Sequence, residues 1–317
     1  PHYSAPLNGE NTGRGIAIGF WMNGSGAACA VANLHTDGKI TLVEGSADIG
    51  GTRTSISQQF AEVLGIPVED IQPQVADTDS IGFTSGTGGS GATFKSGLAA
   101  YQAAHDMKSQ LVERAAVLWE TTPDQIDYSD GVMQLKNNSD LSLTFKELAD
   151  KVITLGGPVV GSANIYPGGS AGAFNATIVD LEVDPETGKV NILRYTALQD
   201  AGIAIHPGYV EGQIQGGAVQ GIGWALNEEY FMSDDGKMLN SSFLDYRMPT
   251  SLDLPMIDAV IVEVPNPNHP FGVKGVGEVG IVPPMAAIAN AISDAVGINM
   301  NELPMNPNAI LSAMTEE

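Results

Sequence analysis

The stretch ACAVANLHTDGKITLVEGSADIGGTRTSISQQFAEVL, from Ala28 to Leu64, contains the unit from which the fold is built. Two apolar runs flank Thr36-Asp37-Gly38-Lys39, and an Asp-Gly pair between such runs predicts a β-hairpin. A glycine-rich loop follows from Glu44 to Thr52, and the residues from Thr54 to Leu64 predict a helix that stops at Gly65. The stretch therefore predicts a hairpin, a loop and a helix in that order.

The same order of elements recurs in the second half of the chain. The apolar residues Val179, Leu181 and Val183 alternate with acidic residues, which is typical of a half-buried strand. Pro185-Glu186-Thr187-Gly188 turns the chain, and a returning strand leads into a loop that contains aspartate, histidine and glycine. A helix is then expected over Val210–Glu229, so one structural unit is used twice.

This repeat predicts an α+β fold with two lobes of hairpin–helix units, in which each lobe packs a sheet layer against a helix layer. We place the lobe boundary near Gly157, which gives a first lobe over residues 1–157 and a second over 158–317. Three further helices are expected, over Ala92–Trp119, Phe145–Leu155 and Pro284–Val296.

The chain has 317 residues and a formal net charge of −23, from 14 basic and 37 acidic side chains. This excess of acid argues against binding to nucleic acid or to an anionic membrane surface, because both need clustered basic residues. Cys29 is the only cysteine, and we interpret it as a buried structural thiol. This chain alone cannot hold an iron–sulfur cluster, and a reduced, cytoplasmic setting is expected.

Four loops are rich in glycine, and backbone without side chains can approach a large planar or phosphate-bearing ligand. These loops cover residues 45–52, 82–91, 208–223 and 272–280. Each loop by itself is equally consistent with an ordinary turn. The pattern therefore indicates either a ligand lined by backbone or a chain with many turns, and both interpretations stay open at this point.

Two side chains in these loops are candidates for a role in catalysis. Glu278 is the one carboxylate in the segment Phe271–Gly280, and a carboxylate held close to bare backbone and apolar residues suits a general base. The alternative is a solvated turn residue. Gln213 lies near the start of a helix, where its amide suits donation of a hydrogen bond to an oxo group. The alternative is again a solvated polar position.

Taken together, the motifs resemble the molybdenum-binding subunits of the xanthine dehydrogenase/aldehyde oxidase family. The matching pieces are Thr36-Asp37-Gly38, Gly45–Thr52, Thr84–Ser90, Gly212–Gly221 and Gly272–Glu278, and they occur in the family's order. The match corresponds to the carboxyl-terminal half of that subunit. The resemblance implies a molybdenum–molybdopterin cofactor in its cytosine dinucleotide form.

The resemblance also implies roles for individual residues. Glu278 takes the place of the catalytic base, which removes a proton from the oxygen nucleophile, and Gln213 that of the glutamine that hydrogen-bonds the apical oxo ligand. No side chain is expected to ligate the metal, because the pterin dithiolene holds it. The implied cofactor-binding positions are Gly50, Gly51, Thr52, Gly88, Gly89, Ser90, Gly91, Gln213, Gly275 and Gly277.

One position departs from the family pattern. Gly51 stands where family members commonly carry the glutamine of a Gly-Gln-Gly motif, so that side-chain contact is lost. That part of cofactor binding would then fall to the backbone or to a partner.

The resemblance implies a molybdenum hydroxylase that hydroxylates an electrophilic carbon of a nicotinate-like N-heterocycle with oxygen from water. Aldehydes or purines are the alternative substrates, and a non-catalytic acidic α+β binding or assembly subunit is the alternative role. The expected partners are a second chain with the amino-terminal half of the molybdenum subunit, an iron–sulfur subunit and an FAD subunit. The last two would carry Fe–S clusters and FAD and receive the electrons.

Overall fold

The computed structural model describes residues 6–75, 77, 79–168 and 171–315. These residues form two compact units, each made of more than one segment of the chain. Unit 1 contains the described residues of 1–22, 172–264 and 276–317. Unit 2 contains the described residues of 23–171 and 265–275.

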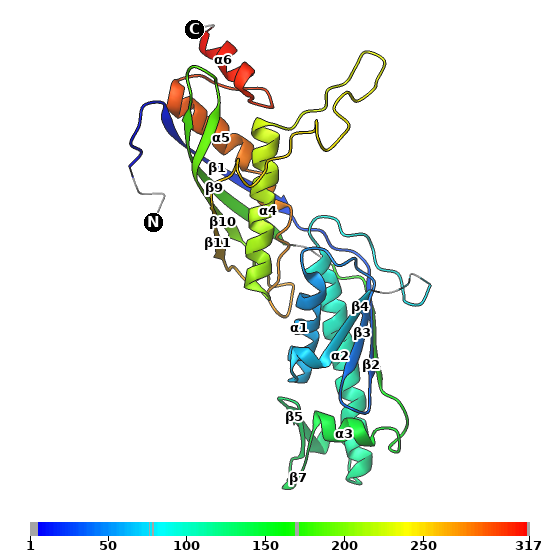
Figure 1. Ribbon diagram of the computed structural model, residues 1–317. Helices are drawn as coiled ribbons and strands as arrows, with labels where there is room; N and C mark the ends of the chain where they lie inside the picture. The colour runs from blue at the N-terminus through cyan, green and yellow to red at the C-terminus, as the bar shows by residue number, and fades with distance from the viewer. Residues whose placement is uncertain (1–5, 76, 78, 169–170, 316–317) are drawn as a thin grey trace. The chain divides into compact units, whose positions relative to one another are not determined.

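Unit 1 is a four-stranded sheet with helices on one face (Figure 1). The strand order is β1-β9-β10-β11, with β1, β9 and β10 antiparallel and β11 parallel to β10. The helices α4 and α5 share one apolar core with the sheet. The strands are β1 (Thr12–Met22), β9 (Gly172–Val183), β10 (Val190–Asp200) and β11 (Ile257–Val262), and the helices are α4 (Pro207–Leu226), α5 (Pro284–Val296) and α6 (Pro307–Thr315).

Glycines on β1 allow α5 to lie directly on the strand. A Cβ atom at Gly13 or Gly15 would overlap the backbone of α5, at Ala291 and Ala287 respectively. The same side of β1 meets Val282 at Gly19, where a Cβ would lie 2.8 Å from the valine side chain. The side chains that alternate with these glycines therefore point to the opposite face of the sheet.

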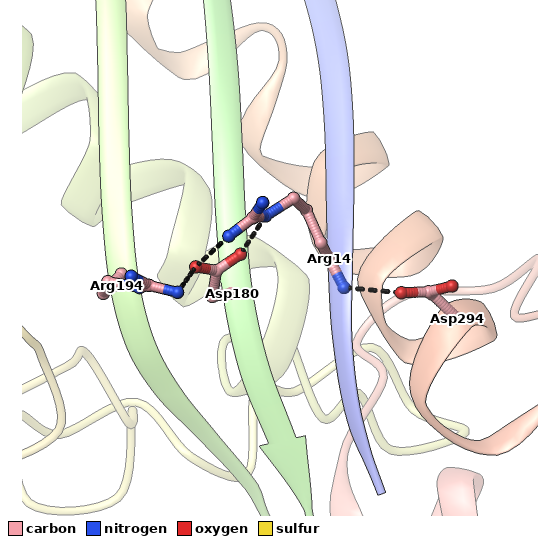
Figure 2. A network of polar contacts seen from close by, with 4 residues as sticks. All are labelled: Arg14, Asp180, Arg194 and Asp294. Carbon is pink, nitrogen blue, oxygen red and sulfur yellow. Dashed lines mark hydrogen bonds and ion pairs between the residues drawn. The ribbon is translucent and has the colours of Figure 1, made fainter. Parts of the chain in front are cut away.

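Three charged side chains tie β1, β9 and β10 together on that opposite face. Asp180 on β9 accepts from Arg14 on β1 at 2.6 Å and pairs with Arg194 on β10, also at 2.6 Å (Figure 2). The Asp180 carboxylate is nearly inaccessible because the two guanidinium groups cover it. The backbone N–H of Arg14 also donates to Asp294 on α5, which holds β1 to the helix.

Unit 2 contains a second four-stranded sheet and a smaller three-stranded one. The larger sheet has the order β4-β3-β2-β8, and α1 and α2 cover one of its faces. Its elements are β2 (Ala28–Leu34), β3 (Ile40–Glu44), β4 (Ile71–Val75), β8 (Val160–Ile165), α1 (Thr52–Leu64) and α2 (Ala92–Leu118). The smaller sheet contains β5 (Ile126–Ser129), β6 (Val132–Leu135) and β7 (Asn138–Thr144), followed by α3 (Phe145–Lys151).

The two predicted hairpin–loop–helix units are confirmed. Strands β2 and β3 pair around the Asp-Gly turn and lead to α1, and β9 and β10 pair and lead to α4. The helices predicted from Ala92 and from Pro284 also form, and Cys29 is buried at 2% exposure. The α+β class is confirmed as well, since each unit packs a four-stranded sheet against helices, although unit 2 also has a three-stranded sheet.

The single lobe boundary near Gly157 differs from the division that the structure has. Strand β1 pairs along its whole length with β9, so residues near the N-terminus belong with the second half of the chain. Strand β8 follows Gly157 but pairs with β2, which keeps it in unit 2. Helix α3 ends at Lys151 rather than at Leu155, and Thr154 Oγ1 there bonds the Lys151 carbonyl that a longer helix would use.

The stretch Val279–Val296 is long and apolar enough, by composition, to cross a membrane. In the structure its helical part, α5, packs on β1 and places Ala287, Ile288, Ala291 and Ile292 in the core of unit 1 with 0% exposure. Its apolar character is therefore that of a core helix.

Candidate functional site

Glu278 lies in unit 1, directly before the 3₁₀ turn Val279–Ile281. Its side chain is half-buried. The indole Nε1 of Trp21, near the end of β1, donates a hydrogen bond to Glu278 Oε2 at 3.2 Å. The carboxylate is thus held by a side chain from a rigid strand, which fixes its direction better than a loop contact would.

A buried row of polar side chains holds the segment that leads to Glu278. The amide Nε2 of Gln199 donates to the Val276 carbonyl at 2.8 Å, and Gln199 Oε1 accepts from Asn175 at 3.0 Å. Thr177 Oγ1 in turn donates to Asn175 Oδ1 at 3.0 Å. Gln199, Asn175 and Thr177 are at most 1% exposed, so breaking one of these bonds would leave a buried polar group unsatisfied.

Helix α4 carries Gln213 and packs against the turn that follows Glu278. A Cβ at Gly217 would lie 3.0 Å from the backbone of Gly280, so the two backbones are in close contact. Gly212 and Gly216 differ from Gly217, because a Cβ at either would meet nothing within 4 Å. The Gln213 side chain is half-buried, whereas Gln215 on the same helix donates to the Ile257 carbonyl at 3.4 Å.

In unit 2, the loop before α2 meets two other segments through backbone contacts. A Cβ at Gly91 would overlap the Gly24 carbonyl, and a Cβ at Gly275 would overlap the Ser90 carbonyl. Asn23 bonds both polar groups of Gly275, accepting from its N–H at 3.1 Å and donating to its carbonyl at 3.2 Å. The structure therefore brings together Gly275 and the predicted positions at the start of α2.

The outer side of this loop is open. Gly89 and Ser90 both have positive φ, at 58° and 56°, and a Cβ at Gly88 would meet nothing within 4 Å. Helix α2 begins after Gly91 without a side-chain cap. Helix starts of this kind carry partial positive charge and suit an anionic ligand.

Lys95 supports the loop from inside. It is 0% exposed, and its Nζ donates to the Ser85 carbonyl at 2.5 Å, to Ser85 Oγ at 2.7 Å and to the Gly86 carbonyl at 2.8 Å. These bonds turn the Ser85 and Gly86 carbonyls inward. Burial lowers the pKa of Lys95.

The loop from Gly45 to Gly51 lies beside the loop before α2. A Cβ at Gly45 would overlap Thr84, and Ser46 Oγ hydrogen-bonds Ser96 Oγ on α2. Gly50 and Gly51 are both left-handed, with φ of 59° and 75°, and no side chain caps α1 at Gly51. Thr52, the first residue of α1, is buried.

The loops before α1 and α2 have the features that a molybdopterin would need. Two adjacent loops end at uncapped helix starts, and the loop before α2 has open space over Gly86 and Gly88. This arrangement fits a bulky anionic ligand held by backbone N–H groups. Among the described residues, no group of His, Cys, Asp or Glu lies together in a way that could hold a metal ion.

Sequence reasoning missed four side chains that hold the candidate segments, namely Trp21, Asn175 and Gln199 in unit 1 and Lys95 in unit 2. Asn175 and Gln199 stand at inward positions of strands that are otherwise apolar there, which is the one signal that the sequence offers. Lys95 likewise interrupts the apolar face of a helix.

Comparison with known proteins gives the same family as the sequence motifs. The family pattern described as the molybdopterin cofactor-binding domain matches residues 4–255. The chain is 33% identical over 327 residues to the gamma subunit of the 6-hydroxypseudooxynicotine dehydrogenase complex of Paenarthrobacter nicotinovorans, covering 98% of this chain and 41% of that protein. It is also 33% identical over 297 residues to a putative xanthine dehydrogenase molybdenum-binding subunit of Escherichia coli K12, covering 92% of this chain and 40% of that protein.

The fold has close counterparts among solved structures. The crystal structure of quinoline 2-oxidoreductase from Pseudomonas putida 86 matches with a TM-score of 0.87 and 26% identity, covering 97% of this chain and 42% of that one. The chain thus spans about two-fifths of the length of the curated relatives that it matches.

Proposed function

The chain belongs to the molybdopterin cofactor-binding family, among the molybdenum-binding subunits of the xanthine dehydrogenase type, and we propose that it is the catalytic-base-carrying part of a molybdenum hydroxylase. The observation that carries this proposal is the position of Glu278. Its half-buried carboxylate accepts a hydrogen bond from the Trp21 indole. The chain just before it is held by the buried Gln199 amide, which donates to the Val276 carbonyl. A fixed carboxylate of this kind suits proton abstraction.

When bound, the molybdenum cofactor supplies the oxygen that is inserted into the substrate and takes up the electrons. This chain's residues bind and orient it. The backbone of Gly50–Thr52 and Gly88–Gly91 would hold the anionic groups, with Gly275 and Gly277 allowing close approach. The half-buried Gln213 amide would donate a hydrogen bond to the cofactor, and Glu278 would accept the proton that oxygen transfer releases.

The proposed substrate is an N-heterocycle of the nicotinate type, in which a C–H bond next to ring nitrogen becomes C–OH with oxygen from water. Two similar proteins have names that refer to N-heterocyclic compounds, a 6-hydroxypseudooxynicotine dehydrogenase complex and quinoline 2-oxidoreductase. On this proposal the chain corresponds to the medium molybdopterin subunit of a nicotinate dehydrogenase. A purine substrate is the alternative, because another relative is named as a xanthine dehydrogenase subunit.

The electrons would leave through partner subunits with Fe–S clusters and FAD. This proposal rests on the names of the relatives, which are subunits of larger assemblies. We further propose the cytosine dinucleotide form of the cofactor, a cytoplasmic location, and a partner chain with the remaining part of the molybdenum subunit. The excess of acidic side chains supports partners other than nucleic acid.

The test is metal and pterin analysis of the natively purified complex that contains this chain. Molybdenum and an oxidised pterin fluorophore in near-equal amount to the chain, with iron and flavin in other chains, is the expected result. A natively assembled complex without molybdenum and pterin would overturn the proposal and favour a binding or assembly role.

A further inference from the structure

Within the described residues, the sheet of unit 1 has one face that no helix covers. On that face β1 presents Ile16, Ile18, Phe20 and Met22, which are 55%, 75%, 47% and 68% exposed. The glycines between them face α5, so β1 is built to be buried on one side and is also apolar on the other. A strand that is apolar on both sides is typical of a sheet that is covered on both faces.

The apolar surface continues across β9. Ile16 pairs with Ile178, and Phe20 pairs with Phe174, whose ring centroid lies 5.1 Å from that of Phe20. Phe174 is itself 54% exposed. We call the surface formed by Ile16, Ile18, Phe20, Met22, Phe174 and Ile178 the outer face of unit 1.

The sheet of unit 2 provides an internal comparison. On its face away from α1 and α2, Asn33, Thr41 and Gln72 form one paired row across β2, β3 and β4, and Ser162 on β8 pairs with Val31. Val31, Val43 and Val160 share this face, so it mixes polar and apolar side chains and lacks the continuous apolar row that β1 has. The two sheets thus differ in outer-face chemistry, although they share a two-layer architecture.

The outer face of unit 1 has a polar limit at one end. There the register places Arg14, Asp180 and Arg194 on the same side of the strands as the apolar residues, and the three side chains form the ion pairs drawn in Figure 2. An apolar centre with a charged rim is the usual composition of a protein interface. The strongly acidic chain disfavours an anionic lipid surface as the occupant.

We infer that the outer face of unit 1 is the docking surface for the part of the molybdenum subunit that this chain does not match, which packs on it with an apolar face of its own. More than half of the length of each relative lies outside the matched stretch. In those relatives that part belongs to the same chain, so its contact is permanent, and permanent interfaces resemble a domain core cut in half. The inference rests on the proposed function, since that function defines the missing part.

The test places a photocross-linker on this face in the natively assembled complex. Ile18→p-benzoylphenylalanine is irradiated, and the linked peptide is identified by mass spectrometry. The expected peptide comes from the remaining part of the molybdenum subunit, whether on a separate chain or on the same polypeptide. The matched variant Gln72→p-benzoylphenylalanine, on the face of the unit 2 sheet away from α1 and α2, is expected not to link to that peptide.

Several results would overturn the inference. These are a link from position 18 to a second copy of this chain, a link to an iron–sulfur or flavin subunit, and no link at all in an intact complex. In a second measurement, for a remaining part on a separate chain, Ile18→Asp is expected to release that chain on gel filtration while the far-ultraviolet circular dichroism of this chain is unchanged. Wild-type stoichiometry with this variant would also contradict the docking surface.

Molybdenum and pterin are measured in the same preparations, so the two proposals can fail separately. A molybdenum-loaded complex with the link elsewhere overturns the docking surface and leaves the function. A complex without molybdenum and pterin overturns the function, whichever peptide position 18 reaches.

Discussion

Trp21 Nε1 and Glu278 Oε2 lie 3.2 Å apart in a hydrogen bond that joins residues 257 positions apart in the sequence. The bond connects the end of β1 to the carboxylate that we propose as the base. Because β1 is fixed by pairing with β9 and by packing on α5, the indole gives the carboxylate a rigid reference point. Trp21 is therefore a positioning residue in the proposed site.

Replacing the indole tests this relationship. Trp21→Phe keeps an aromatic ring but removes the donor, and a hydrogen bond to a charged group contributes about 1.5–3 kcal/mol. We expect kcat of the molybdenum-loaded complex to fall roughly tenfold or more with little change in KM. Steady-state kinetics measures this, with Trp224→Phe as the control because Trp224 is 47% exposed on α4. An unchanged kcat would show that the bond does not orient the base.

The role of Glu278 itself is tested by Glu278→Gln, which keeps the shape of the side chain and removes the proton acceptor. We expect turnover to fall by about two to four orders of magnitude, the usual contribution of a general base, while molybdenum content stays at the wild-type level. Glu186→Gln, in an exposed turn of unit 1, is the matched control. Normal turnover per molybdenum in the Glu278 variant would remove the carboxylate from the mechanism.

Two neighbouring glycines on α4 are expected to respond in opposite directions. Gly216→Ala meets nothing within 4 Å and improves helix propensity, so the free energy of unfolding should rise by about 0.5–1 kcal/mol. Gly217→Ala would press on the Gly280 backbone and should lower it by about 1–3 kcal/mol. Urea unfolding of both variants measures the difference, and equal effects would mean that the contact between α4 and this turn is loose.

Local signals were enough to predict much of the fold. The Asp-Gly turn after β2, the proline at the start of α5 and the glycine after it each fix a boundary by backbone chemistry, and each was found where expected. The pairing of β1 with β9 was not predicted, because strands about 160 residues apart choose one another through burial and not through any local pattern. The predicted lobe boundary near Gly157 differs from the two compact units for the same reason.

The candidate site likewise contains some residues that the sequence can predict and others that only the folded chain shows. Glycine-rich loops and a carboxylate among glycines can be recognised from the sequence, so Glu278 and the Gly88–Gly91 segment are predicted site residues. Lys95 and Gln199 hold those segments through contacts made only in the folded chain. Their side chains look like ordinary polar residues in a helix and a strand until the tertiary structure buries them.

The acid stability of unit 2 provides a last test, through His269. This side chain is 4% exposed and packs on Phe94 at the start of α2, and burial lowers its pKa to about 4 from an ordinary value of 6.5. Between these values the unfolded chain binds a proton that the folded chain excludes, so stability is complete above about pH 6.5 and is lost as the pH falls toward 4. The loss attributable to His269 is on the order of 3 kcal/mol by pH 4.

The variant His269→Gln tests this. In the wild-type chain the Phe271 N–H donates to the imidazole Nδ1 at 3.2 Å, and the glutamine keeps an acceptor for that N–H but does not titrate. In urea unfolding at a series of pH values, the wild-type chain should lose more stability than this variant below about pH 6.5. Parallel curves for the two proteins would mean that the imidazole is protonated without cost in the folded state.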